Sequence, residues 1–230
     1  MIAGLRGSEK EKEKALQILS EKLIFGDPSL MEGLPLPELC FSLLSILEGQ
    51  PSTNITILTL QCINSILPID FTASLFFLRF GLLRLINEIL IQTDSAEAGA
   101  NCFRILSFYT QELPALIPNS IDIHCFMKFM PILSRVDQRE CISLLANITP
   151  HIHTGSLAPL FPFLIKFIQD DDDFIRKKSL NIFASIITAL PNVQLPEKAI
   201  ENLSDQLESA TNFESYSTLI QVLRYISQTP

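Results

Sequence analysis

The sequence predicts an all-α protein built as a right-handed superhelix of stacked helical hairpins. Three observations carry this prediction: a motif that recurs at a near-constant spacing, apolar residues at helical spacing within each copy, and prolines between the copies. Of the 230 residues, 47% are hydrophobic and 18% are charged. A chain with this balance buries a sizeable core, which excludes an intrinsically disordered protein.

The recurring motif is a segment of ten residues that aligns five times without gaps. The copies are separated by 40, 39, 39 and 39 residues, and a weaker copy lies upstream, beginning at Lys14. The five copies begin at Leu60, Ala100, Arg139, Lys178 and Ser217. A period of this length with two helices per unit is typical of armadillo and HEAT arrays, so we expect a solenoid of that type with five to six hairpins.

The aligned copies share columns of apolar residues. One column holds Cys62, Cys102, Cys141, Leu180 and Leu219, and another holds Ile66, Leu106, Leu145, Ala184 and Leu223. Apolar residues three apart, such as Ile142, Leu145 and Ile148, place one stripe of each helix in the core. These copies are therefore expected to be inward-facing helices of a shared core.

The partner helix of each hairpin is expected between the copies, at residues 38–47, 71–91, 122–133, 157–168 and 197–207. Prolines stand near the ends of the copies, such as Pro68 within the first copy and Pro150 just after the third, and proline ends a helix because it has no backbone N–H to donate. No segment alternates apolar and polar residues over enough length to predict a strand. We expect residues 1–13 to be a charged N-terminal tail and residues 14–230 to form a single repeat domain.

Composition and charge exclude several classes of function. The formal net charge of −8 argues against nucleic acid and anionic membrane as partners. The most apolar stretch, residues 71–91, contains Arg79, Arg84, Asn87 and Glu88, so we expect a buried helix rather than a membrane span. Five widely spaced cysteines are a poor disulfide framework, and the first residues lack the apolar core of a signal peptide. The expected location is the cytoplasm, the nucleus or both.

Residues that could carry chemistry are few, and each has a simpler interpretation. His151 and His153 could join a metal site with Cys141 or His124, but a surface loop is the better interpretation because nothing else has ligand spacing. Cys125 beside His124 could be a nucleophile, yet its apolar neighbours favour a buried, inert thiol. We expect no catalytic residue, no metal and no cofactor; an enzyme stays the third hypothesis.

The segment around residues 168–176 carries a more specific mark. Acidic residues end one predicted helix, and Ile175 and Arg176 begin the next. This arrangement resembles a HEAT unit, in which an Asp precedes a Val-Arg pair. The resemblance implies that Arg176 binds Asp170 or an acid of a neighbouring unit, and Arg139 sits in a weaker version. Four adjacent aspartates could also suggest calcium, but a solvated turn fits better because an EF-hand loop spaces its ligands and needs a Gly.

The first hairpin resembles the armadillo-like region of HECT-type ubiquitin ligases of the ubiquitin-fusion-degradation (thyroid-receptor-interactor) class. The residues that carry this resemblance are Leu23, Gly26, Gly33, Pro35, Leu43 and Leu47. It extends from about Lys14 to Leu190. It implies a non-catalytic region that recruits degradation substrates, while the thioester chemistry belongs to a separate domain that this chain lacks. Another solenoid scaffold, of the nuclear-transport or phosphatase-regulatory type, stays the alternative; zero Trp disfavours the transport adaptor.

The partner-binding residues are expected on the aligned helices, which the resemblance places on the concave face. Amide side chains there suit an extended protein segment, because an amide both donates to and accepts from a peptide backbone. An equally simple interpretation is a row of solvated polar residues. The predicted positions are Gln61, Asn64, Asn101, Arg104, Ser143, Asn147, Asn181, Ser185, Gln221 and Arg224.

Overall fold

The computed structural model describes residues 2–24, 35–153 and 156–189, and short helical runs at 201, 203–204, 217, 219–220 and 222–224. Within this part of the chain every element of regular structure is a helix, and no strand occurs. None of the described helices is both long and apolar enough to cross a bilayer. The chain divides into two compact units, Met1–Leu113 with Ser120–Cys125, and Pro114–Asn119 with Phe126–Pro230.

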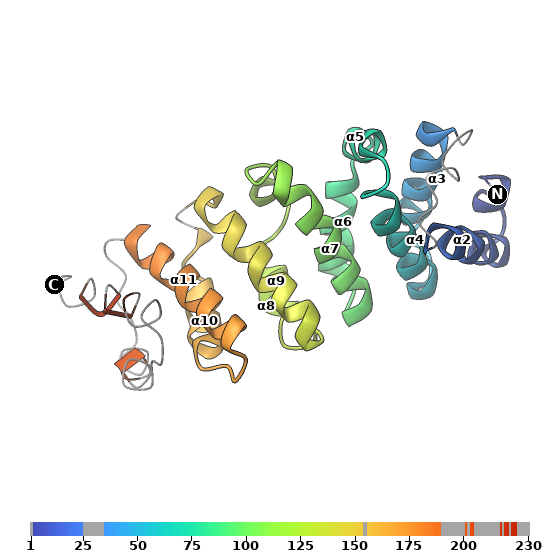
Figure 1. Ribbon diagram of the computed structural model, residues 1–230. Helices are drawn as coiled ribbons and strands as arrows, with labels where there is room; N and C mark the ends of the chain where they lie inside the picture. Colours follow the sequence, from blue (N-terminus) through green and yellow to red (C-terminus); the bar gives the residue numbers. More distant parts are fainter. Residues whose placement is uncertain are drawn as a thin grey trace. The chain divides into compact units, whose positions relative to one another are not determined.

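The first unit consists of two layers of helices. Its elements are α1 (Ile2–Leu5), α2 (Glu9–Ile24), α3 (Leu36–Glu48), α4 (Thr53–Ile66), α5 (Phe71–Arg79), α6 (Leu82–Gln92) and α7 (Ala96–Glu112). In one layer α2 packs on α4 and α4 packs on α7, as Figure 1 shows. In the other layer α3 packs on α5 and α6. We call α2, α4 and α7 the inner layer, since α4 and α7 contain the first two aligned copies, and α3, α5 and α6 the outer layer.

The second unit also pairs the aligned helices with helices that lie between the copies. Its elements are η2 (Ile117–Asn119), α9 (Arg135–Ile148), η3 (Thr149–His151), α10 (Leu160–Ile168) and α11 (Asp173–Ala189), and α8 (His124–Phe129) begins at the boundary between the units. The aligned copies at Arg139 and Lys178 lie on α9 and α11, which pack on each other, and α10 packs on α11. The last expected hairpin lies largely outside the described residues.

The cores of both units contain the repeat columns. Cys62, Cys102 and Cys141 are each fully buried, and Leu180 and Leu219 are 4% and 2% exposed. In the second column Ile66, Leu106 and Leu145 are fully buried, whereas Ala184 and Leu223 are half-buried. The prediction of an all-α solenoid is therefore confirmed, with the first column and the first three members of the second column in the core.

Two predicted boundaries are wrong. The apolar stretch 71–91 is two helices rather than one, because Gly81 adopts a φ of +89° between α5 and α6. Only glycine takes up this left-handed conformation without strain, so the chain turns there. The expected tail at residues 1–13 instead contains α1 and the start of α2; Leu5 is 1% exposed, and Arg6 pairs with Glu38 at 2.8 Å.

Candidate functional site: the inner-layer helices

A chain of amide contacts joins α4 to α7 in the first unit. Asn64 Nδ2 donates to the backbone oxygen and to Oδ1 of Asn101, both at 3.1 Å. Asn101 Nδ2 in turn donates to the backbone oxygen of Glu97 at 2.9 Å, which determines the orientation of its amide. One turn earlier, Gln61 Nε2 donates to Glu97 Oε1 at 3.2 Å. Predicted residues from adjacent repeats therefore do come together, and they bond to each other.

The structure corrects the role of Asn101. We expected it at an exposed, non-core position, but its side chain is 2% exposed and its amide is occupied by Asn64 and Glu97. Asn101 is therefore a link between helices rather than a contact residue. On the same layer Gln61, which donates to Glu97, is half-buried and Arg104 is exposed, so part of each side chain lies at the surface.

The sequence analysis missed three residues of this surface. Glu97 accepts from Gln61, and Asn54 Nδ2 donates to Glu13 Oε1 at 2.6 Å, which joins α4 to α2. Glu97 lies four residues before Asn101 and therefore on the same face of α7, so helical spacing alone could have found it. Asn54 and Glu13 lie just before the aligned segments, so the repeat alignment does not include them.

The predicted residues of the second unit are arranged more openly. Asn147 on α9 and Asn181 on α11 are exposed, and their side-chain amides bond to no residue in the described ranges. Ser143 is half-buried, and Ser185 is exposed and donates to the backbone oxygen of Asn181 at 2.9 Å. Arg224 is exposed within the helical run 222–224, whereas Gln221 lies outside the described residues.

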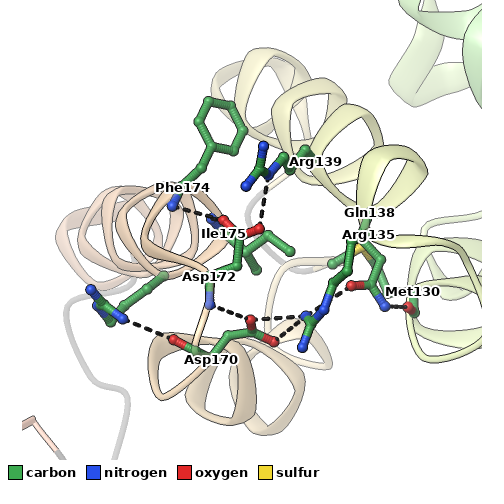
Figure 2. A network of polar contacts seen from close by, with 9 residues as sticks. Met130, Arg135, Gln138, Arg139, Asp170, Asp172, Phe174 and Ile175 are labelled. Atoms are coloured by element: carbon green, nitrogen blue, oxygen red, sulfur yellow. Dashed lines mark hydrogen bonds and ion pairs between the residues drawn. The ribbon is translucent and has the colours of Figure 1, made fainter.

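An ion-pair network joins α9 to the corner before α11. Figure 2 shows two arginines of α9 pointing toward two aspartates of this corner. Arg135 Nη1 lies 2.9 Å and 2.8 Å from the two carboxylate oxygens of Asp170, and Arg139 Nε lies 2.8 Å from Asp172 Oδ2. The hydrogen bond from Arg139 holds the pKa of Asp172 below its usual value of 3.8. Both aspartate side chains are about nine-tenths buried, at 11% and 10% exposed.

The HEAT-like resemblance anticipated part of this network. Arg176 Nη1 donates to the backbone oxygen of Asp170 at 2.9 Å, and Nη2 lies 2.6 Å from Asp173 Oδ1. The expected contact between Arg176 and Asp170 is confirmed, but it involves the carbonyl group, because the Asp170 carboxylate binds Arg135. Asp170 and Asp172 are thus occupied by arginines and backbone N–H groups. Among the described residues no cluster of His, Cys, Asp or Glu could hold a metal ion.

The cysteines have the environment of core residues. All five are free and buried. Burial raises the pKa of Cys40 and that of Cys62 to about 12, and it also raises the pKa of Cys102 and of Cys141. A thiol in this state holds its proton at neutral pH and is a poor nucleophile.

Comparisons with known proteins identify the fold. No family model matches the sequence, and no curated protein matches it. Among solved structures, computationally designed armadillo repeat proteins for modular peptide recognition align at a TM-score of 0.69 and 17% identity, covering 97% of this chain and 97% of theirs. A second designed armadillo repeat protein aligns at a TM-score of 0.61 and 17% identity over 98% of both chains. An engineered protein aligns at a TM-score of 0.64 and 17% identity, covering 99% of this chain and 96% of its own. The chain therefore has the all-α solenoid fold of armadillo type.

Proposed function

We propose that this chain is a non-catalytic protein-binding solenoid whose inner layer binds an extended segment of a partner protein. The observation that carries the proposal is the polar surface of α2, α4 and α7, where side chains of adjacent repeats join across the helices. These polar side chains recur at the spacing of the repeats, and an extended partner segment can contact such a row along its length. The peptide recognition described for one of the structural neighbours supports the same use of the fold.

The individual side chains have different roles in this proposal. Gln61 and Arg104 contact the partner, since they are accessible, and Asn64 and Asn101 join the helices that hold them. An amide and a guanidinium at neighbouring repeats suit backbone carbonyls and a carboxylate of the bound segment. In the second unit Asn147 and Asn181 are exposed, their amides bond to no residue that the structure describes, and they serve the same purpose.

In its finer form, the proposal is that this chain is the substrate-recruiting region of a HECT-type ubiquitin ligase that acts in the cytoplasm or nucleus. Its support is the sequence resemblance of the first hairpin. Leu43 and Leu47 are core residues of α3, and Leu23 is a core residue of α2. Gly26 and Gly33 lie outside the described residues. Because buried leucines are shared by many solenoids, a scaffold of another pathway is the competing function.

Affinity purification with mass spectrometry tests both levels. We expect the wild-type chain to retain protein partners that a Gln61→Ala, Arg104→Glu variant loses, while Lys166→Glu, an exposed change on α10, retains them. Retention by all three proteins would exclude the inner layer of the first unit as the binding surface. Ubiquitin-pathway partners would favour the ligase role, and transport or phosphatase subunits would favour the competing one.

A further inference from the structure

The outer layer of the first unit carries an exposed apolar surface that the proposed function does not use. On α5, Phe71 is 63% exposed and Leu75 is 50% exposed, and on the adjacent α3 Phe41 is 54% exposed. Single exposed apolar side chains are ordinary, but large ones grouped on neighbouring helices mark an interaction site. We call Phe41, Phe71, Leu75 and Arg79 the α5 face.

The α5 helix is held firmly beneath this face. Asp70 caps its start, where Oδ1 accepts from the backbone N–H of Thr72 at 2.7 Å and of Ala73 at 3.3 Å. Phe77 is fully buried, and Tyr109 Oη donates to the backbone oxygen of Ser74 at 2.9 Å, which ties α5 to α7. The exposed side chains are therefore presented by a fixed backbone, which lowers the entropy cost of binding.

Aromatic contacts join the two helices of the α5 face. The rings of Phe76 and Phe80 stack with centroids 6.1 Å apart. The ring of Phe80 then meets Phe41 edge to face at 5.9 Å. Phe76 and Phe80 are half-buried, so an aromatic contact that is partly open to solvent links α5 to α3.

The charged residue that α5 contributes to this face is Arg79, and on α3 the exposed Glu38, three residues before Phe41, pairs with Arg6. Arg79 is the sole charged residue of α5, it is exposed, and no residue in the described ranges bonds its guanidinium. Phe71, Leu75 and Arg79 follow one another at intervals of four residues, so they lie along the same side of the helix. Eight residues of helix place the arginine about 12 Å from Phe71.

We propose that the α5 face binds a segment of a partner protein that carries two apolar side chains followed by an Asp or Glu. The apolar pair covers Phe71, Leu75 and Phe41, and the carboxylate pairs with Arg79, whose planar guanidinium suits that group. A second copy of this chain or a lipid surface fits less well. If two copies paired through this face, each Arg79 would meet a surface of the same positive charge. A single arginine also gives little attraction to anionic lipid.

The test uses a phage-displayed library of random peptides on the full chain, with counter-selection on a Leu75→Ser, Arg79→Glu double variant. We expect enriched peptides to carry two apolar residues one helical turn apart and an acid within the following turn. Fluorescence anisotropy with one such peptide then compares single variants. We expect Leu75→Ser to weaken binding at least tenfold, and Arg79→Glu to prefer the peptide whose acid is replaced by Lys. Val136→Ser, which removes a side chain that is 70% exposed on α9, is the control and should bind normally.

Several outcomes would overturn the proposal. The proposal is wrong if the library yields no peptide that binds the wild-type chain better than the double variant. It is also wrong if the enriched peptides carry no acidic residue. A dimer in sedimentation velocity that Leu75→Ser abolishes would identify a second copy as the occupant. Binding to phosphatidylserine vesicles that Leu75→Ser abolishes would identify a lipid surface. Circular dichroism checks that the variants are folded, and we expect them to be because the substituted positions are exposed.

Discussion

The two carboxylate oxygens of Asp172 bind two different helices: one accepts from Arg139 of α9, and the other caps the start of α11. Oδ2 accepts from Arg139 Nε of α9 at 2.8 Å. Oδ1 accepts from the backbone N–H of Phe174 at 3.0 Å and of Ile175 at 3.3 Å, which caps the start of α11. One residue therefore both begins a helix and joins it to the preceding repeat, as Figure 2 shows.

The two roles of Asp172 can be separated by substitution. Asn keeps an oxygen that caps the helix but loses the negative charge, whereas Ala loses both functions. We expect Asp172→Ala to lower the urea midpoint of unfolding more than Asp172→Asn. Arg139→Gln should have the same unfolding midpoint as Asp172→Asn. The variant that combines these two substitutions should unfold at a midpoint no lower than that of either single variant. Equal midpoints for the Asn and Ala variants would show that the cap contributes nothing.

The pH dependence of this ion pair follows from the lowered pKa of Asp172. A carboxyl group whose pKa is lower in the folded than in the unfolded state stabilises the fold above its usual value of 3.8. That contribution is lost as the pH falls through the lower, folded pKa. We expect the difference in unfolding midpoint between wild type and Asp172→Asn to be greatest near neutrality and to shrink below 3.8. A difference that stays constant over this range would argue against the ion pair as its cause.

Asn101 and Asn147 give a matched test of burial within the aligned helices. Asn101→Ala removes hydrogen bonds to Asn64 and Glu97 at a fully enclosed position, and we expect a loss of about 1–2 kcal/mol in the free energy of unfolding. Asn147 is exposed, so Asn147→Ala should change that free energy by less than about 0.5 kcal/mol. Chemical denaturation measures both. Equal effects would mean that the side-chain hydrogen bonds of Asn101 to Asn64 and Glu97 contribute no net stability.

The repeat columns explain why the fold was predictable and the site was less so. Burial of Cys62, Cys102 and Cys141 follows from helical periodicity, which one sequence contains. Burial of Asn101 depends on the distance of α4 from α7 and on the presence of Asn64 opposite it, and neither is visible in a single helix. For the same reason the resemblance, which implies that Arg176 binds Asp170 or an acid of a neighbouring unit, does not indicate that Arg135 of the preceding repeat binds the Asp170 carboxylate.

Gly81 is the residue of the sequence that indicates the break between α5 and α6. A φ of +89° strains any residue with a side chain, even though a Cβ there would meet its nearest neighbour, Arg84 Nε, at an unstrained 4.0 Å. We therefore expect Gly81→Ala to destabilise the chain by about 1 kcal/mol. Gly49→Ala is the control, because Gly49 has a φ of −71° that alanine adopts readily. A Gly81→Ala variant as stable as wild type would contradict the strained turn between α5 and α6.

The buried thiols lead to a prediction about reactivity. All five cysteines are enclosed, and burial raises the pKa of Cys40 and that of Cys62 to about 12. Because the thiolate is the reacting form, Ellman's reagent should react far more slowly with the folded chain than with the chain unfolded in urea. The unfolded chain, which contains five cysteines, is the internal control for complete reaction. A folded chain that releases the chromophore as fast as the unfolded one would show that a thiol is accessible.

The same burial bears on ubiquitin transfer, which needs a cysteine that forms a thioester. The attacking thiol must lose its proton and reach the carbonyl carbon of a donor thioester, and a thiol within the core of a repeat does neither. Incubation with activating and conjugating enzymes, ATP and ubiquitin should therefore give no reducible adduct of this chain. The active conjugating enzyme in the same reaction, visible as its own thioester, is the control. A reducible adduct that disappears in one Cys→Ala variant would contradict the prediction and would identify the residue that carries the activity.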